Sequence, residues 1–406
     1  MKSRMMKKIL IVGGGIRQVQ LLDAAKKMNY HVVLCDMTTE CPGYKFADTY
    51  YAASTMDYEA LLDVARKEKV DGIMTNSEPA MPIVTRIANE LGLVGNSENG
   101  INVLMSKSRF RDLQKEVGVY YPKHFVTSSL TELFDKMPEL TYPIIIKPCE
   151  CSGSRGSRKI ERYDEKIIEE VFTDCKKYSR NSMVAVEEYV EMPSLTTIEG
   201  DIFLYEGEIL WDGLFYTTRA AWAPMVPMTY TAPLFLEKEK FDKLKDTLSK
   251  LFKAAGVQFG EYNIEGYFNK NGDFFVIEIN VRQGGHEIPL LIYDYTGVDL
   301  CKLLVSTAVR DTDYWNYVKS YERKYRYAIK QTTFSQEAGK YAGLYIDDSI
   351  KKYVTRTLEY LKEGDAVEKC VDGTSLVAIV DLIFPTFEEQ LNVYEKINDL
   401  ITIKVK

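Results

Sequence analysis

The segment that most constrains the fold of this chain covers residues 260–285 and predicts a β-hairpin. Two runs of alternating apolar residues are joined there by Asn271-Gly272, and Asn-Gly between such runs is the strongest short-range signal for a two-residue hairpin turn. Counting back from that turn along both strands puts Glu265 directly opposite Glu278. Because side chains alternate between the two faces of a strand, we expect both carboxylates on one face of the hairpin.

Two opposed carboxylates on one face need a physical reason, because they repel each other. The same count puts Asn263 opposite Asn280 on that face, so carboxylate and amide oxygens gather there. Hard cations such as Mg²⁺ favour these oxygens, and a cation between the two acids would offset their repulsion. The alternative, which the hairpin alone leaves open, is a face whose charges are solvated by water.

Length and composition limit the classes of protein to consider. A chain of 406 residues is too long for one ordinary core and predicts two or three domains. A net charge of -7 argues against binding to the phosphate backbone of nucleic acid. Seven scattered cysteines do not resemble a disulfide framework and indicate a reducing, cytoplasmic location. The basic start precedes only a short apolar run, so we expect neither a secretory signal nor a membrane span.

The first hundred residues predict an α/β domain that ends near residue 105. An apolar strand leads into Gly13-Gly14-Gly15, and a helix and a second strand follow, the strand ending at Asp36. The glycines and Asp36 match part of a dinucleotide fingerprint, but Gln18 stands where a third glycine is expected. A nicotinamide-dependent oxidoreductase is therefore one alternative, and glycines that only permit a tight turn are the other.

A second motif with chemical meaning follows a helix that opens at Lys107. An apolar strand within residues 142–148 delivers Lys147 and runs directly into a Gly/Ser loop over residues 151–157. Small residues let backbone N–H groups approach phosphate oxygens closely, and the lysine adds a positive charge. We favour phosphate binding here over the alternative, a surface turn after an ordinary strand.

The remaining sequence completes the domain organisation. A strand before the hairpin ends in Glu187-Glu188-Tyr189-Val190, and an aromatic-rich segment covers residues 211–235. After about residue 325 strands and helices alternate again, with a helix expected over residues 350–361. This restart predicts a small C-terminal α+β domain.

In this order the segments resemble the ATP-grasp superfamily of carboxylate–amine ligases, and they are similar to its carbamoyl-phosphate-synthase-like and amino-acid ligase branches. The most specific motif is Glu278-x-Asn280-x-Arg282, preceded by Glu265. The resemblance covers essentially the whole chain and implies an α/β and α+β fold of three domains. These are a Rossmann-like preATP-grasp domain over 1–105, an ATP-grasp domain over 106–315 with a small subdomain over about 121–187 and a hinge at 187–190, and a C-terminal α+β domain over 316–406.

The resemblance also implies how ATP would be bound. Two lysines would contact its phosphates under a flexible loop, and the hinge would contact the adenine edge. The residues concerned are the lysines Lys107 and Lys147, the loop residues Gly153, Ser154, Gly156 and Ser157, and the hinge residues Glu187, Glu188, Tyr189 and Val190. The family's second acid for the ribose is missing after this hinge. Glu265, Glu278 and Asn280 would bind Mg²⁺ or Mn²⁺.

The activity implied is the ATP-dependent joining of a small carboxylate, such as an amino acid or a peptide-like acid, to an amine. Arg282 and Lys147 would stabilise an acyl phosphate, and ADP and phosphate would be released. Candidate substrate residues are Arg219, Trp222 and His286, with Trp211, Tyr216, Met225 and Tyr230 around them. A bicarbonate-using carboxylase and a non-catalytic nucleotide-binding module are further alternatives. The resemblance makes a homodimer plausible.

Overall fold

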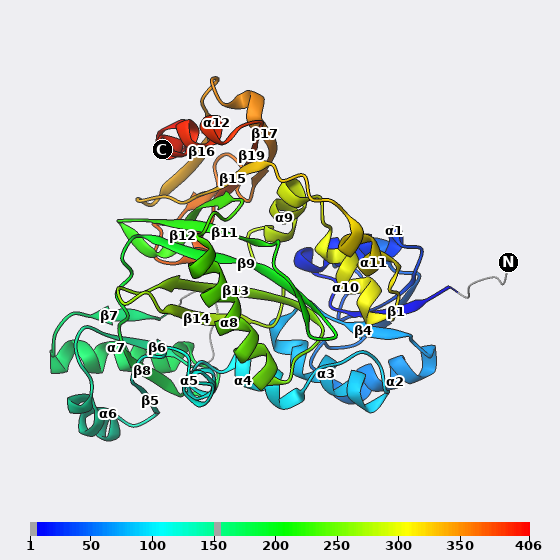
Figure 1. Ribbon diagram of the computed structural model, residues 1–406, viewed down its shortest axis with the longest axis horizontal. Helices are drawn as coiled ribbons and strands as arrows, with labels where there is room; N and C mark the ends of the chain where they lie inside the picture. The colour runs from blue at the N-terminus through cyan, green and yellow to red at the C-terminus, as the bar shows by residue number, and fades with distance from the viewer. Residues whose placement is uncertain (1–5, 150–155) are drawn as a thin grey trace.

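Three groups of secondary structure are arranged around one long sheet in the computed structural model, which describes residues 6–149 and 156–406 (Figure 1). The N-terminal group is blue in Figure 1, a small antiparallel sheet lies at the lower left, and the C-terminal segments are orange and red at the top. This arrangement confirms the predicted α/β and α+β architecture. The described helices are all too short or too polar to cross a membrane.

The N-terminal group is a parallel sheet in the order β3-β2-β1-β4. Its strands are β1 (Lys8–Val12), β2 (His31–Asp36), β3 (Thr49–Ala52) and β4 (Gly72–Met74). Its helices are η1 (Ile16–Gln18), α1 (Val19–Lys27), η2 (Tyr44–Phe46), α2 (Tyr58–Glu68), η3 (Glu78–Ala80) and α3 (Met81–Glu90). Alternate residues of β1 pack against α1 on one face and against α2 and α3 on the other, which explains why residues 9–12 are all apolar.

A small four-stranded sheet in the order β5-β8-β6-β7 follows two connecting helices. Its strands are β5 (His124–Thr127), β6 (Ile144–Pro148), β7 (Arg158–Ile160) and β8 (Val184–Glu188). The helices of this region are α4 (Glu98–Met105), α5 (Lys107–Glu116), α6 (Leu130–Lys136), η4 (Met137–Glu139) and α7 (Glu165–Tyr178). One face of the sheet packs against α6 and α7, so the polar residues of the strands lie on the opposite face.

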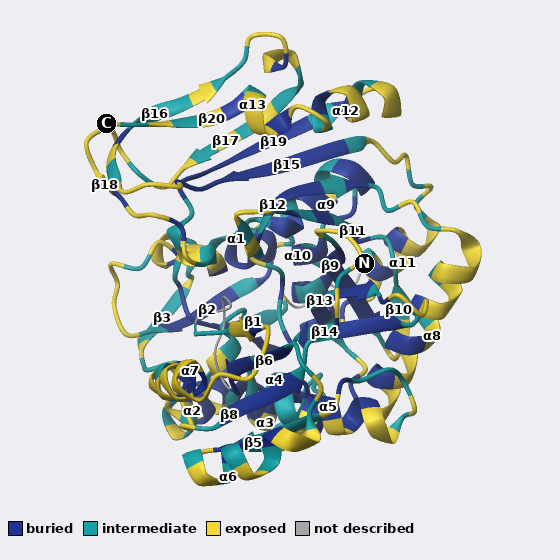
Figure 2. Cartoon of the chain, turned by 90° about the vertical axis from the view of Figure 1, so that its left-hand side faces the viewer, coloured by how far each residue is buried: buried dark blue, intermediate teal, exposed yellow. Residues whose placement is uncertain are grey.

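The central sheet has the order β14-β13-β9-β11-β12-β15-β19-β17, with β10 paired to β9. Its strands are β9 (Thr196–Tyr205), β10 (Glu208–Leu210), β11 (Leu214–Ala220), β12 (Ala223–Ala232), β13 (Gly260–Phe268), β14 (Phe274–Asn280), β15 (Tyr327–Thr333), β17 (Val354–Glu359) and β19 (Ala378–Phe384). Figure 2 shows most of these strands as buried. Since β12 pairs with β15, the sheet runs without a break across the expected domain boundary at residue 316.

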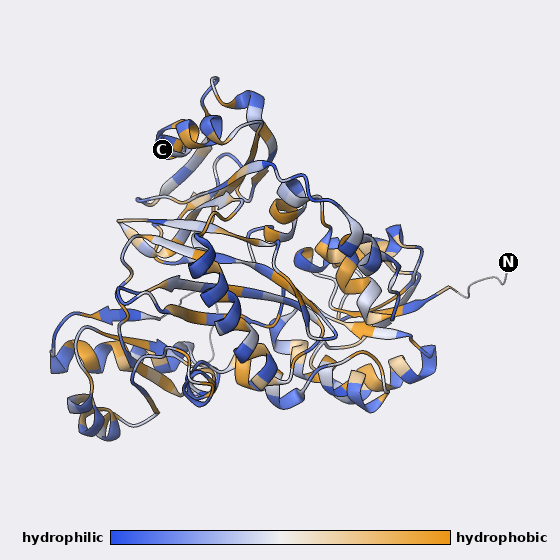
Figure 3. Ribbon diagram, in the orientation of Figure 1, coloured by the Kyte–Doolittle hydropathy of each residue, from blue (hydrophilic) through white to orange (hydrophobic). Residues whose placement is uncertain are grey.

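Helices cover both faces of the central sheet. They are α8 (Lys238–Ala255), α9 (Ile288–Thr296), α10 (Leu300–Ala308) and α11 (Asp313–Ser320). Helix α8 packs Leu244, Leu248 and Leu251 against the hairpin strands β13 and β14. Figure 3 shows that the side of α8 turned toward the viewer is mainly hydrophilic, as expected for an amphipathic surface helix.

The C-terminal segment adds a three-stranded sheet in the order β18-β16-β20. Its elements are β16 (Gly339–Ile346), η5 (Lys351–Tyr353), β18 (Ala366–Val367), η6 (Gly373–Ser375), α12 (Phe387–Tyr394), α13 (Ile397–Leu400) and β20 (Ile401–Val405). The prediction of a helix over residues 350–361 was wrong, because β17 forms there and pairs with β19. The sequence of β17, VTRTLE, is rich in β-branched residues and alternates between half-buried and exposed positions, which suits a strand.

The hairpin has the predicted pairing at the acids but a different turn. Glu265 faces Glu278 as expected. However, Asn269 N donates to Asp273 O at 2.9 Å, so the turn encloses three residues rather than two. The Asn269 side chain favours this wider turn, since its Oδ1 accepts from the backbone N–H groups of Asn271 (2.9 Å) and Asp273 (3.0 Å). An extra residue in β14, Ile277, forms a β-bulge that restores the expected register.

Candidate active site

A cavity of about 900 Å³ lies where the N-terminal group, the small sheet, the central sheet and the C-terminal segment meet. Arg17 and Glu78 line it from the first of these and Lys147 from the second. Glu278 lines it from the hairpin, and Tyr360 lines it from the C-terminal segment. A cavity of this size, built by four parts of the chain, is the default candidate for a small-molecule site.

The hairpin contributes a row of carboxylates to this region. Glu265 on β13 lies between Glu199 on β9 and Glu278 on β14, so three acids face one another across neighbouring strands. Arg219 of β11 donates to Glu199 at 2.9 Å and also to Glu265. Burial raises the pKa of Glu265 to about 8, and Glu199 and Glu278 add to the shift although Arg219 opposes it. Glu199 was not predicted as a site residue, because nothing in the sequence indicates that β9 lies next to β13.

The predicted metal ligands come together at the edge of this row. Asn280 Nδ2 lies 3.2 Å from Glu278 Oε1 and 3.2 Å from Asn263 Oδ1. Lys107 Nζ lies 3.6 Å from Glu278 Oε2. Burial works against ionisation of Glu278, but Lys107 and the hydrogen bond from Asn280 keep its pKa below the usual value.

These residues fit a cation that is shared with a phosphorylated ligand. No group of three or more acidic, histidine or cysteine side chains forms a ready metal cage among the described residues. Mg²⁺ commonly uses only one or two protein carboxylates and takes its remaining ligands from phosphates and water. Glu265, Glu278 and the Asn280 amide match that pattern.

A buried ion cluster joins the small sheet to the hairpin. Lys147 pairs with Glu187, and Arg111 Nε donates to the other oxygen of Glu187 at 2.7 Å. Arg111 also donates to the carbonyls of Val276 (3.1 Å) and Ile277 (2.9 Å) at the β-bulge. Burial, with the charges of Arg111 and Lys107, holds the pKa of Lys147 well below its usual value. Arg111 was not predicted as a site residue. The one indication in the sequence is its position one helical turn after Lys107, which places both side chains on one face of the helix.

The predicted hinge residues line the same cavity. The Glu188 carboxylate accepts from Thr141 N at 2.9 Å, so it is anchored to the small sheet. Tyr189 N donates to Pro143 O at 2.8 Å, and Val190 O accepts from the Tyr267 hydroxyl at 2.5 Å. These bonds fix the backbone that connects the small sheet to the central one.

The predicted phosphate loop is described only in part. Gly153 and Ser154 lie outside the described residues. Gly156 has φ of 72°, a conformation that favours glycine, and its carbonyl accepts from Cys175 Sγ at 2.9 Å. Ser157 lines the cavity.

The segment after the metal motif is held by the N-terminal group. Arg282 Nε lies 3.3 Å from Glu78 Oε2, and both residues line the cavity. His286 and Glu287 have φ of 53° and 57°, an uncommon conformation for residues with a Cβ and one often found at functional sites. His286 Nδ1 lies 2.6 Å from the Tyr230 hydroxyl, and burial lowers the pKa of His286 to about 4. His286 is therefore a neutral, weakly basic imidazole at pH 7.

The other candidate substrate residues are dispersed. Arg219 lines the cavity, whereas Trp222 is 42% exposed at the turn between β11 and β12. Trp211 and Tyr216 pack against the core beneath α8, and Tyr230 is buried. The predicted residue Met225 lines the cavity as well, together with Pro224 and Pro227 of the same hairpin.

Other residues of the chain occupy the space around the glycine turn that follows β1. Gly14 N donates to Asp36 Oδ2 at 2.8 Å, and Gly43 N donates to Gly14 O at 2.7 Å. A Cβ on Gly14 would lie 2.6 Å from Cys41 Sγ. The carboxylate of Asp36 is therefore engaged at the turn, which favours the tight-turn interpretation over a dinucleotide site.

Two family profiles match the chain. The PylC-like N-terminal domain matches residues 9–97, and the ATP-grasp domain matches residues 140–289. The carbamoyl phosphate synthase large chain of Clostridium acetobutylicum is 25% identical over 366 residues, which cover 85% of this chain and 33% of that protein. The chain thus spans about a third of the length of this curated relative.

Solved structures share the fold over nearly the whole chain. L-amino acid ligase from Bacillus licheniformis has a TM-score of 0.79 at 19% identity, covering 98% of this chain and 99% of that one. The biotin carboxylase domain of Hydrogenobacter thermophilus 2-oxoglutarate carboxylase, solved with MgADP and bicarbonate, has a TM-score of 0.70 at 18% identity. It covers 99% of this chain and 92% of that one. The resemblance predicted from the sequence is confirmed at the level of the fold.

Cation binding at this face should release a proton from Glu265. With a pKa raised to about 8, the carboxyl is roughly 90% protonated at pH 7, and a bound cation requires the carboxylate. Preformed MgADP titrated into the protein at pH 7 should therefore release close to one proton. The release should fall toward zero at pH 9.5. Calorimetry in buffers of different ionisation enthalpy measures it, and equal release at both pH values would contradict this assignment.

Proposed function

We propose that this chain, which has an ATP-grasp domain and a PylC-like N-terminal domain, is an ATP-dependent carboxylate–amine ligase. The observation that carries the proposal is the opposed pair Glu265 and Glu278, which lines the large cavity together with Lys107. The likeness to an L-amino acid ligase supports an amino acid or a peptide-like acid as the carboxylate.

ATP would lie between the small sheet and the hairpin. Lys107 and Lys147 supply positive charge for its phosphates, and the hinge backbone at Glu188 to Val190 would face the adenine. Lys147 is already paired with Glu187, so the buried lysine is held in place before nucleotide arrives. Preorganised charge of this kind binds a polyanion without further ordering of side chains.

A divalent cation such as Mg²⁺ or Mn²⁺, held by Glu265, Glu278 and Asn280, would neutralise the triphosphate and favour phosphoryl transfer. Asn280 is oriented for this role by its bond to Asn263. Lys107 would compensate the charge of Glu278 before a cation is bound.

The reaction divides a difficult condensation into two steps. A carboxylate oxygen of the acid attacks the γ-phosphorus, the bond to the β–γ bridging oxygen breaks, and ADP leaves. The amine nitrogen then attacks the acyl carbon, inorganic phosphate leaves with the bonding electrons, and the nitrogen loses a proton. Arg282, which is fixed by Glu78, and Lys147 would stabilise the charge on the transferred phosphoryl group.

Arg219 is the candidate for contacting the acid substrate. Its Nη2 is occupied by Glu199 and Glu265, whereas its buried Nε has no hydrogen-bond partner among the described residues. A buried donor without an acceptor is costly, and a substrate carboxylate at the cavity wall would satisfy it.

Replacing Glu278 by Gln should abolish the activity. The amide keeps the shape of the side chain but removes the charge that a cation requires, so substrate-dependent ADP release should fall at least about a hundredfold. The assay is ADP release over pooled amino acids and other carboxylates with amines, followed by mass spectrometry of the product. Glu239→Gln, on the exposed face of α8, is the matched control. Unchanged turnover in Glu278→Gln would refute the metal assignment.

Replacing Arg219 by Lys should separate the two roles of this side chain. Lysine keeps a positive charge beside Glu199 and Glu265 but removes the Nε donor. The KM for the acid should rise about tenfold or more, while the KM for MgATP stays within about twofold. Steady-state kinetics with each substrate varied in turn provide the test. Equal rises in both KM values would mean that Arg219 acts only through the face that carries Glu265 and Glu278.

A further inference from the structure

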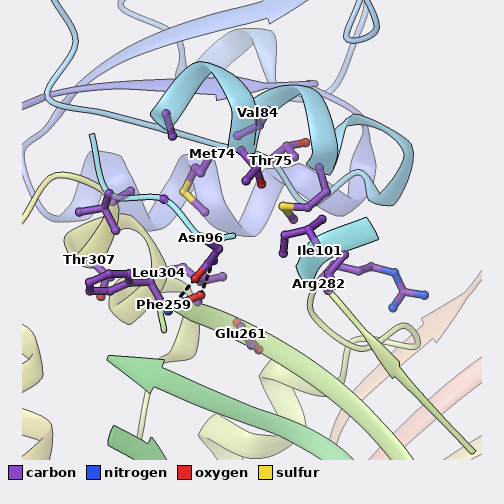
Figure 4. A pocket seen from close by; sticks show the side chains of 18 of the residues that line it. Met74, Thr75, Val84, Asn96, Ile101, Phe259, Glu261, Arg282, Leu304 and Thr307 are labelled. Atoms are coloured by element: carbon purple, nitrogen blue, oxygen red, sulfur yellow. Dashed lines mark hydrogen bonds between the residues drawn. The ribbon is translucent and has the colours of Figure 1, made fainter. Parts of the chain in front are cut away.

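A second cavity, of about 100 Å³, lies between the N-terminal sheet and the start of β13 (Figure 4). Most of its wall is apolar, with residues from β4, α3, α4 and α10. They include Met74, Val84, Ala88, Ile101 and Leu304. Figure 4 shows Glu261 at one side of this cavity and Thr307 at another. Asn76, Arg282 and Gln283 line both this cavity and the large one.

The polar groups at one end of the cavity are arranged around the side-chain amide of Gln283. Gln283 Nε2 donates to Glu261 Oε2 at 2.8 Å, and Asn76 Nδ2 donates to Gln283 Oε1 at 3.1 Å. Asn76 Oδ1 is buried and lacks a hydrogen-bond partner among the described residues. The same holds for the hydroxyl of Thr307, farther along the wall. The unsatisfied groups are thus oxygens that can accept hydrogen bonds.

The carboxyl of Glu261 belongs to a buried acid pair. It is hydrogen-bonded to Asp201 of the neighbouring strand β9, and burial together with the charge of Asp201 raises the pKa of Glu261 well above its usual value. Burial raises the pKa of Asp201 as well. Asp201 also accepts from Gly284 N at 3.0 and 2.9 Å and from Asn263 Nδ2 at 2.8 Å. Arg282 lies close enough to affect Asp201 but is itself paired with Glu78.

We propose that this cavity binds a short primary alkylammonium ion. Its ammonium group would donate to Glu261 and to Asn76 Oδ1, and its alkyl chain would lie against Met74, Ile101 and Leu304. Buried acceptor oxygens without donors, Glu261 Oε1 among them, select a donor-rich group, the two neighbouring carboxyl groups favour a cation over an anion, and the apolar wall selects a hydrocarbon chain. The volume suits a chain of about four carbons, because a cavity of about 150 Å³ admits benzene.

The proposed site lies next to the segment that follows Arg282. Gln283 and Gly284 belong to the segment that connects Arg282 to His286, and both are bonded to the Asp201–Glu261 pair. An ammonium ion bound to Glu261 would therefore contact one of the two acids that hold Gln283 and Gly284 in place.

The test is calorimetric titration and thermal unfolding of the full chain with n-butylammonium chloride, at constant ionic strength and without nucleotide. Saturable binding and a rise in the melting temperature are expected for n-butylammonium. The uncharged n-butanol and tetramethylammonium, which has charge but no N–H donor, should bind at least about tenfold more weakly.

Two variants locate the site. Glu261→Gln should weaken n-butylammonium binding at least about tenfold, because the amide brings N–H donors and no charge to the place of the accepting carboxyl group, and it keeps the size of the side chain. Ala88→Leu should block the cavity from its apolar side, and Glu59→Gln, an exposed residue of α2, is the control. No saturable binding, equal binding of n-butanol, or unchanged affinity in Glu261→Gln would each overturn the proposal, with water then filling the cavity. Because the readout needs no ATP turnover, these outcomes do not depend on the ligase proposal.

Discussion

Repulsion within the row Glu199, Glu265 and Glu278 is the constraint on which the rest of the site depends. Three acids on neighbouring strands are unfavourable unless cations accompany them, because each lies within reach of the next. The protein supplies Arg219 from β11 at one end of the row and Lys107 from α5 at the other. Burial raises the pKa of the middle acid, Glu265, to about 8, although Arg219 also donates to it. The face is therefore built to accept positive charge from outside the chain.

The same interactions connect the parts of the molecule. Arg111 donates both to Glu187 in the small sheet and to the bulge carbonyls of β14, so the register of the hairpin that carries Glu265 and Glu278 is tied to the position of the small sheet. On the opposite side, Arg282 meets Glu78 of the N-terminal group. Sites formed by several bodies in this way respond to movements of any one of them.

Local patterns in the sequence predicted much of this structure, and tertiary contacts account for the rest. Alternation along β13 and β14 was enough to place Glu265 opposite Glu278. The turn was mispredicted because the Asn269 side chain bonds two backbone N–H groups, and the bulge at Ile277 compensates for the extra residue. Arg111 could not be assigned, since its partners are far away in the chain. The strand β17 was mistaken for a helix because its pairing with β19 determines its conformation.

Glu265, Glu278 and Asn280 are proposed to complete a cation site only together with the phosphates of a nucleotide. Counting bound Mn²⁺ by electron paramagnetic resonance, with and without a non-hydrolysable ATP analogue, tests this most directly. We expect weak or no Mn²⁺ binding to the protein alone and tight binding of one or two ions per chain with the analogue present. Mn²⁺ binding that is equally tight without the analogue, or absent with it, would contradict the account.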